Sequence, residues 1–201
     1  MAKKLIGLFL LLYIIFNCDY AFPSTDKVDS LWEPKEGKEL IGRAAPGLSG
    51  LKWLNVNPIE MDDLKGRVVL IRFWLTGCSF CINTAPSLNE LYQKYRDEGL
   101  FIIGIHHPKS EMARDPELVT KAAKTLGFRF PIAQDNDWKV INKYWLGGNK
   151  RSYTSSSFLI DKQGVIRFIH DGGEFYRSET NKEANSAYTT LEGKIQELLN
   201  E

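Results

Sequence analysis

Cys78 and Cys81 are separated by two residues, a spacing that suits reversible disulfide chemistry. The thiolate is the nucleophilic form of cysteine, and at the first turn of a helix its pKa falls from about 8.5 into the range of about 3.5–7.5. Free backbone N–H groups and the helix dipole stabilise the negative charge there. We therefore expect Cys78 to be the nucleophile and Cys81 to attack the resulting mixed disulfide and release the product.

The residues around the pair predict the elements that position it. An apolar run, Val68–Trp74, predicts a strand buried on both faces, as in a parallel sheet. Thr76 and Gly77 interrupt this run. Apolar residues then recur at helical spacing: Leu88, Leu91, Tyr92 and Tyr95. Cys78 is expected at the first turn of this helix, and Cys81 one turn further along on the same side.

Two other roles for the pair stay open. Two cysteines three residues apart can supply half of a zinc site, but zinc takes four ligands and the sequence has no second CxxC. The pair could also be two core residues on one helix face. Its position after a buried strand, within a βαβ pattern, favours redox chemistry.

The remaining elements predict an α/β domain with a mixed central sheet flanked by helices. A second apolar run, Leu100–Ile105, follows the first helix without a hairpin signal, which predicts a right-handed parallel crossover. Lys162-Gln-Gly164 lies between two apolar runs and predicts a hairpin. Further helices are expected over 116–126, 139–144 and 187–199, and further strands over 157–161 and 165–169.

Length and charge limit the classes of protein. The 201 residues suffice for one domain with short extensions. The 26 basic and 25 acidic residues give a net charge of +1, so neither a nucleic-acid partner nor a strong acidic field is expected.

The N-terminus predicts export. Lys3 and Lys4 precede twelve uncharged residues, Leu5–Phe16, which is typical of a secretory signal and shorter than the ~20 residues of a membrane-spanning helix. Residues 1–21 are predicted to be a signal peptide, cleaved or retained, or a lipoprotein signal that tethers the protein to the membrane. In the lipoprotein case Cys18 carries the lipid, and with a cleaved signal peptide it is removed. Each outcome places the rest in an oxidising compartment, where an exposed CxxC can form its disulfide.

Residues 22–44 are mostly polar and are predicted to be a spacer between the membrane and a domain over 45–201. Contact with a membrane is expected only through the N-terminal segment.

Seven short segments carry a family resemblance. In chain order they are Ala45-Pro46, Lys52–Asn55, Leu64–Val69, Phe73–Cys81, Gly104–His106, Asp135–Asp137 and Phe158–Asp161. This region resembles the TlpA-like thioredoxin superfamily, and within it the thioredoxin-like domains of DipZ-type cytochrome c biogenesis proteins and of NHL-repeat proteins. The resemblance implies a thioredoxin fold, here with an N-terminal extension, and thiol-disulfide exchange outside the cytoplasm. It implies no cofactor besides the Cys78–Cys81 disulfide.

Partners also follow from the resemblance. Protein thiols and disulfides are the implied substrates, and a membrane electron donor of the CcdA/DsbD type is the implied source of electrons. Trp74, Thr76, Gly77, Thr154 and Ser155 are predicted to line the substrate site.

Ser155 departs from the family pattern, because it follows Thr154 in the position where thioredoxin-like proteins carry a cis-proline facing the CxxC. A cis bond costs ~2.5–4 kcal/mol before other residues, against ~0.5–1 kcal/mol before proline, so we expect a trans bond. Ser155 either donates its hydroxyl to a thiolate or belongs to a polar loop that enters a strand.

Three further positions depart from the pattern. Arg72 stands where thioredoxins place a buried acid, and it either favours a thiolate or, as we expect, forms an ion pair with a carboxylate across the sheet. Thr84 occupies the position of a glutamate in many TlpA-like proteins. Gly77 replaces a tryptophan, which predicts a more open site.

His106 and His107 end the strand that follows the CxxC helix, at the sheet edge where the thiols are expected. Two cysteines and a histidine would form a soft site for copper or zinc. Copper-delivery proteins of the Sco type share the implied fold, but they have a CxxxC spacing, whereas this chain has CxxC. Hydrogen bonding at the strand end is favoured over ligation for both histidines, and no metal site is predicted.

These patterns together predict an exported, periplasmic or otherwise extracytoplasmic thiol-disulfide oxidoreductase. A reducing role is favoured, because relatives of the TlpA and DipZ type receive electrons from membrane carriers. The alternatives are a Sco-like copper metallochaperone and a thiol peroxidase. A peroxidatic cysteine would need a Thr-x-x-Cys setting, and Thr76 lies two residues from Cys78 rather than three.

Overall fold

The structure is a computed structural model, and it describes residues 32–201. The predicted signal segment, Cys18 and residues 22–31 of the predicted spacer lie outside the described residues. Within residues 32–201, no helix has both the length and the apolar character needed to cross a membrane.

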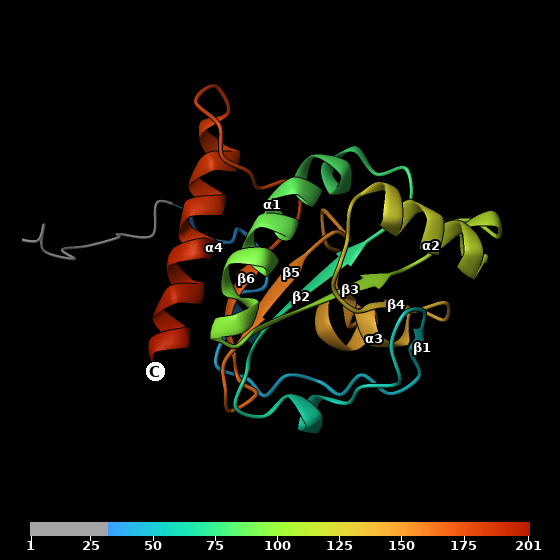
Figure 1. Cartoon of the computed structure of the whole chain (residues 1–201), viewed down its shortest axis with the longest axis horizontal. Coiled ribbons are helices and arrows are strands. Elements are labelled where there is room, and N and C mark those ends of the chain that lie inside the picture. The colour runs from blue at the N-terminus through green and yellow to red at the C-terminus, as the bar shows by residue number, and fades with distance from the viewer. Residues whose placement is uncertain (1–31) are drawn as a thin grey trace, which may run out of the picture.

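A six-stranded mixed sheet forms the centre of the domain, with the strand order β1-β4-β3-β2-β5-β6 (Figure 1). The strands are β1 (Lys52–Trp53), β2 (Val68–Trp74), β3 (Leu100–His106), β4 (Ile132–Gln134), β5 (Ser157–Ile160) and β6 (Ile166–His170). β2, β3 and β4 are parallel, whereas β1, β5 and β6 pair antiparallel to their neighbours. The predicted parallel pairing of the two central strands and the predicted hairpin are confirmed.

Four helices flank the sheet. They are α1 (Ser79–Tyr95), α2 (Pro116–Thr125), α3 (Lys139–Ile141) and α4 (Lys182–Asn200). α1, α2 and α4 cover one face, and α3 covers the other (Figure 1). α3 is shorter than the helix predicted over 139–144, because the chain continues as a π-helical turn, Asn142–Leu146.

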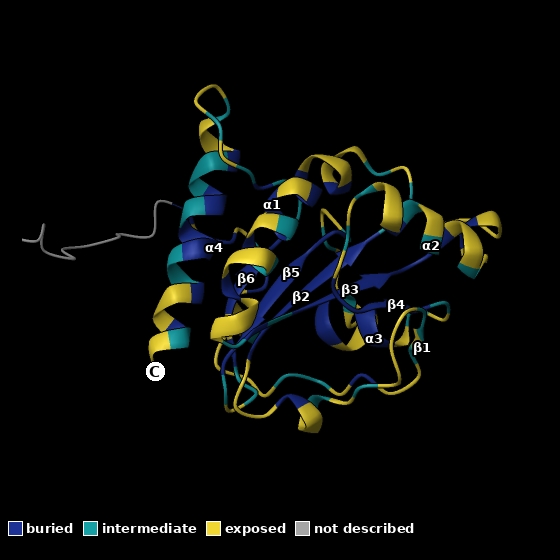
Figure 2. Cartoon of the chain, in the orientation of Figure 1, coloured by how far each residue is buried: buried dark blue, intermediate teal, exposed yellow. Residues whose placement is uncertain are grey.

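β2 explains why the sheet has two apolar faces. All seven of its residues are buried, and successive side chains point to opposite sides. Leu70 and Trp74 pack among the residues of α1, α2 and α4, while Ile71 and Phe73 pack toward α3. Figure 2 shows the result: strands β2 to β5 are almost entirely buried, and the helices bury the side that meets the sheet.

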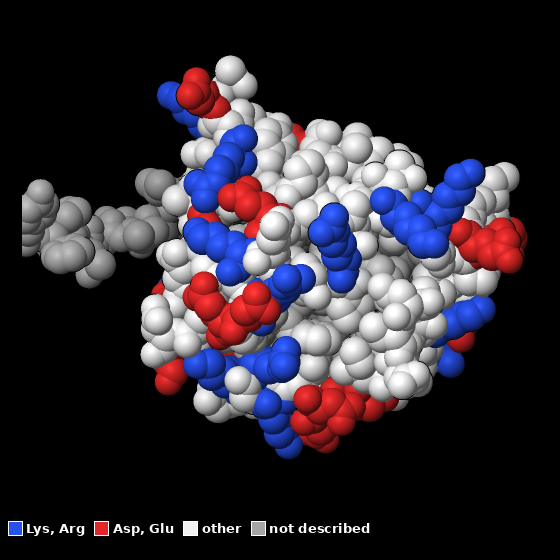
Figure 3. Space-filling model, in the orientation of Figure 1, with Lys and Arg blue, Asp and Glu red and all other residues white. Residues whose placement is uncertain are grey.

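The outer surface carries charges of both signs. On the face seen in Figure 3, Lys and Arg side chains alternate with Asp and Glu side chains, in keeping with the net charge of +1.

The prediction of a spacer over residues 22–44 is wrong for its described part, because residues 32–44 pack onto the domain. The Trp32 ring lies 4.7 Å from the His170 ring and parallel to it, and 5.6 Å from the Phe168 ring. The Gly42 N–H donates to the Ile166 carbonyl at 2.8 Å. One buried aromatic side chain therefore anchors a stretch whose overall composition is polar.

Candidate active site

The candidate site lies at one edge of the sheet. β2 ends there at Trp74, its parallel neighbour β3 ends at His106, and the antiparallel β5 begins at Ser157. The loop after β2 carries Cys78 to the start of α1. Open α/β sheets bind their ligands at such edges, beyond the carboxyl ends of parallel strands.

Cys78 caps α1 instead of lying within its first turn. The Cys81 N–H donates to the Cys78 sulfur at 3.2 Å, so the thiol takes the place of the usual capping hydroxyl. Cys78 is half-buried, Cys81 is 2% exposed, and both are free thiols. A visiting molecule can reach the first sulfur, whereas the second is accessible mainly from the first.

Three kinds of interaction lower the pKa of Cys78 to about 6. They are the hydrogen bond from the Cys81 thiol, the backbone N–H groups of Cys81 and Phe80, and the charge of Arg72, and together they outweigh the effect of partial burial. The pKa of Cys81 is raised, because its thiol donates to Cys78 and is buried. Near neutral pH, Cys78 is therefore a thiolate and Cys81 keeps its proton.

Arg72 lies on the α1 side of the sheet, since it shares the side-chain parity of Leu70 and Trp74. It is 1% exposed, and its guanidinium donates to the Ser157 hydroxyl at 3.2 Å and to the Gly173 carbonyl at 3.0 Å.

The predicted ion pair of Arg72 is wrong, because no carboxylate of the described residues pairs with it. The neighbouring strand presents Ser157 at that position instead of an acid. Burial lowers the pKa of Arg72, and the two cysteines raise it. The charge that remains to compensate this guanidinium is therefore the Cys78 thiolate.

The two histidines hold the loops that border Cys78, which confirms their predicted hydrogen-bonding role. The Thr76 N–H donates to His106 Nε2 at 3.2 Å, and His107 Nε2 lies 2.9 Å from the Thr154 hydroxyl. Both rings are fully buried. Burial lowers the pKa of His106 to about 4 and that of His107 to about 3, so both are neutral at physiological pH.

The copper alternative gains no support from this geometry. Residues 32–201 contain no group of three or more His, Cys, Asp and Glu side chains placed to hold a metal ion. The Nε2 atoms of both histidines are already hydrogen-bonded to the loops.

Trp74, Thr76 and Gly77 line a hollow of about 370 Å³ between the CxxC turn and α2. Gly77 has φ +74°, and a Cβ atom at this position would meet nothing within 4 Å. The backbone therefore requires glycine for its left-handed conformation, and a tryptophan would be strained there even though space is available.

Thr154 and Ser155 lie in the loop that leads into β5. Residues 32–201 contain no cis peptide bond, so the bond between them is trans, as expected. Ser155 is buried, and none of the hydrogen bonds found in the described part of the chain joins it to a cysteine. The hypothesis that Ser155 donates to a thiolate therefore lacks support.

Sequence reasoning missed two aromatic residues, one in the CxxC turn and one packed against it. Phe80, between the two cysteines, is 37% exposed, and its ring lies 5.6 Å from that of Tyr153, which is 42% exposed. Large exposed aromatic side chains next to a nucleophile are a signal that the sequence could have provided for Phe80. Thr84, the residue in the glutamate position, donates to the Phe80 carbonyl at 2.7 Å.

A mixed sheet with an accessible and a buried thiol at the start of the helix after its central strand defines a thioredoxin-like dithiol protein. Residues 41–169 match the AhpC/TSA family, and the chain belongs to this family. It also belongs with the thioredoxin-like thiol-disulfide oxidoreductases, since it is 36% identical to the thiol-disulfide oxidoreductase ResA of Bacillus anthracis over 129 residues, which cover 64% of this chain and 68% of ResA.

Two further comparisons support the placement. Protein DipZ of Mycobacterium bovis is 38% identical over 141 residues, which are 68% of this chain and 20% of DipZ, so the chain spans about one fifth of the length of that relative. The crystal structure of a putative thiol:disulfide interchange protein DsbE from Chlorobium tepidum shares the fold, with a TM-score of 0.63 and 22% identity, over 79% of this chain and 97% of that one.

Proposed function

We propose that this protein reduces disulfides of exported proteins through Cys78 and Cys81. The observation that carries the proposal is the asymmetry of the pair: a half-buried Cys78 with a pKa of about 6 lies above a buried Cys81 that keeps its proton. Cys78 is suited to attack a substrate disulfide, and Cys81 is suited to attack the mixed disulfide that results.

The exchange takes two steps. The Cys78 thiolate attacks one sulfur of the substrate disulfide, the substrate S–S bond breaks, and the second substrate sulfur leaves as a thiolate. Cys81 then gives up its proton to that leaving thiolate and attacks the Cys78 sulfur. The Cys78–Cys81 disulfide forms, and the first substrate sulfur leaves and takes a proton from water. Two electrons have passed to the substrate.

Each cycle leaves the protein oxidised, so a dithiol donor must restore it. We propose a membrane electron donor of the CcdA/DsbD type, and a location outside the cytoplasm reached through residues 1–21, with Cys18 as a lipid anchor in the lipoprotein case. The charge of Arg72 favours the thiolate, which makes the pair a milder reductant than the same pair without it.

Insulin reduction by the purified protein with dithiothreitol as donor tests this function. We expect turnover that is lost in Cys78→Ser, and an equilibrium with glutathione that yields the reduction potential of the couple. Full turnover in Cys78→Ser would refute the role of this cysteine. A potential too high to reduce ordinary protein disulfides would reverse the proposed direction.

Membership of the AhpC/TSA family and the guanidinium beside the thiols favour a thiol peroxidase as the second candidate. That function predicts hydroperoxide turnover that survives Cys81→Ser through a sulfenate on Cys78. The copper alternative predicts Cu(I) binding that needs His106 or His107 besides both cysteines.

A further inference from the structure

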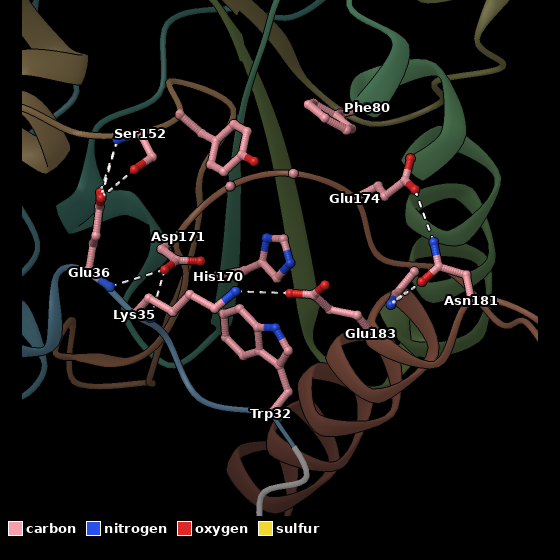
Figure 4. Close-up of a pocket in the computed structure, with 14 residues that line it drawn as sticks. Trp32, Lys35, Glu36, Phe80, Ser152, His170, Asp171, Glu174, Asn181 and Glu183 are labelled. Carbon is pink, nitrogen blue, oxygen red and sulfur yellow. Dashed lines mark hydrogen bonds and ion pairs between the residues drawn. The ribbon is translucent and has the colours of Figure 1, made fainter.

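A second hollow is lined in part by Phe80, the residue before Cys81 in the sequence (Figure 4). Its volume is about 200 Å³, and its walls come from the N-terminal segment after Trp32, the loop at Tyr153, the loop from His170 to Glu174, and the start of α4. Pockets for small-molecule ligands usually measure about 300–1,000 Å³, so this one suits a single long side chain.

The lining is acidic. Four carboxylates, those of Glu36, Asp171, Glu174 and Glu183, face one ammonium group, that of Lys35. The Lys35 ammonium lies 3.2 Å from Glu183, where both side chains are largely exposed at the rim. The other three carboxylates have no cationic partner among the described residues.

Neutral donors hold three of these carboxylates in place. Asp171 accepts from the backbone N–H groups of Lys35 at 2.7 Å and of Glu36 at 3.0 Å. Glu36 accepts from the Ser152 backbone N–H at 3.1 Å and from its hydroxyl at 2.6 Å. Glu174 accepts from the side-chain amide of Asn83 at 2.7 Å, and from that of Asn181 at 3.2 Å (Figure 4). These hydrogen bonds fix the positions of the carboxylates and leave their negative charges uncompensated, as expected of a site that binds a cation.

His170 adds a buried polar atom without a hydrogen-bond partner. Its ring stands in the hollow above Trp32 (Figure 4), it is 1% exposed, and its Nδ1 atom is buried without a hydrogen-bond partner in the described structure. Burial lowers the pKa of His170 well below its ordinary value, so the ring is neutral and adds no repulsive charge. A buried polar nitrogen without a partner is costly, and a donor that enters the hollow would relieve this cost.

The mouth of the hollow is aromatic, and one of its rings comes from the CxxC turn. The rings of Phe80 and Tyr153 meet edge to face, and Phe80 lies between the two cysteines in the sequence. Aromatic faces attract cations, and guanidinium groups in particular stack on them. A side chain that passes this mouth therefore belongs to a residue close to the reacting sulfur of the substrate.

We propose that this hollow binds a basic side chain, arginine before lysine, that lies beside the reacting cysteine of a polypeptide substrate. The protein thus selects protein disulfides with a neighbouring cation, an inference that rests on the proposed oxidoreductase function. Arginine is favoured because its planar fork can reach a carboxylate and the imidazole nitrogen together while it stacks on an aromatic ring.

Matched peptides test the selection. Each peptide carries one cysteine joined by a disulfide to a reporter thiol, and the residue beside the cysteine is Arg, Lys, Gln or Glu. The rate of reporter release by the reduced protein is divided by the rate with dithiothreitol, which removes intrinsic differences between the peptides. We expect the Arg peptide to react about fivefold faster than the Gln peptide, and the Glu peptide to react slowest.

Isosteric variants locate the effect. In Glu36→Gln and Glu174→Gln the Arg-to-Gln rate ratio should fall toward one, because each variant removes one charge and keeps an acceptor oxygen. Glu98→Gln is the matched control: it follows the far end of α1, about 25 Å from Cys78 by the rise of the helix, and should keep the ratio.

The outcomes separate the two proposals. If no peptide reacts, the oxidoreductase function itself fails. If all peptides react at equal normalised rates, the function stands and selection by the hollow is refuted. Selection by the hollow is also refuted if Glu98→Gln lowers the Arg-to-Gln rate ratio as much as Glu36→Gln and Glu174→Gln do. The cause would then be the net charge of the protein, and not the carboxylates of the hollow.

Discussion

Replacement of Arg72 by methionine tests the electrostatics of the dithiol most sharply. The guanidinium is buried, has no carboxylate partner among the described residues, and lowers the pKa of Cys78. An opposite charge within about 4–6 Å shifts a pKa by about 1–3 units. The charge of Arg72 lowers the Cys78 pKa less than the hydrogen bonds from Cys81 do. In Arg72→Met we therefore expect the Cys78 pKa to rise by about one unit, from about 6 to about 7.

The same change makes the couple more reducing. At pH 7, a rise of the Cys78 pKa from about 6 to about 7 removes about 1 kcal/mol of thiolate stabilisation, which for two electrons corresponds to about 20 mV. The cost of burying Arg72 is present in both redox states and cancels, so only the lost interaction with the thiolate changes the couple. The reduction potential of Arg72→Met should therefore fall by about 20 mV.

The assay combines the pH dependence of the thiolate ultraviolet absorbance with redox equilibration against dithiothreitol, and urea unfolding of the oxidised form verifies the fold. Arg67→Met is the control, because Arg67 precedes β2 at the opposite end of the strand, where it lies over the Phe101 ring, and should change neither quantity. An unchanged Cys78 pKa, or a higher potential, in folded Arg72→Met would refute the reasoning.

Two further predictions concern the loops around the site. The pKa values of His106, His107 and His170 are lowered by burial, so the unfolded chain binds more protons than the folded one below about pH 6.5. As the pH is lowered from about 6.5 to about 4, the free energy of unfolding should therefore decrease by up to about 1.4 kcal/mol per pH unit for each histidine. Equal free energies of unfolding in urea titrations at pH 7 and pH 5 would contradict this. Gly77→Ala should lower the free energy of unfolding by about 1 kcal/mol in the same titration, because φ is +74° at this position. Gly47→Ala, whose φ is not in the left-handed region, should lower it by less. Equal losses in the two variants would show that the left-handed backbone is not the cause.

The fold was largely predictable, because its central elements carry strong local signals. The run of β2, apolar except for Arg72, ended where the sequence indicated, at Trp74, and the hairpin between β5 and β6 formed around Gly164. The N-terminal segment was predicted wrongly, since Trp32 is buried by contacts with β6, more than 130 residues further along the chain. Composition cannot reveal such a contact.

The site was predictable only in part. The position of Cys78 at the start of the helix and the hydrogen bonding of both histidines followed from local sequence. The environment of Arg72 did not, because its partner depends on which strand lies beside β2, and that strand presents Ser157 instead of an acid. The acidic hollow was not predicted at all, since segments spread between residues 32 and 184 build it.

The most direct test of the account is the trapping of the mixed disulfide with a disulfide-bonded protein substrate. We predict that Cys81→Ser accumulates a covalent adduct through Cys78, identified by the mass of the cross-linked peptide and released by dithiothreitol. Cys78→Ser should form no adduct on the same timescale, because Cys81 is 2% exposed and its pKa is raised. An adduct that forms as quickly in Cys78→Ser, or its absence in folded Cys81→Ser, would contradict the assignment of nucleophile and resolving thiol.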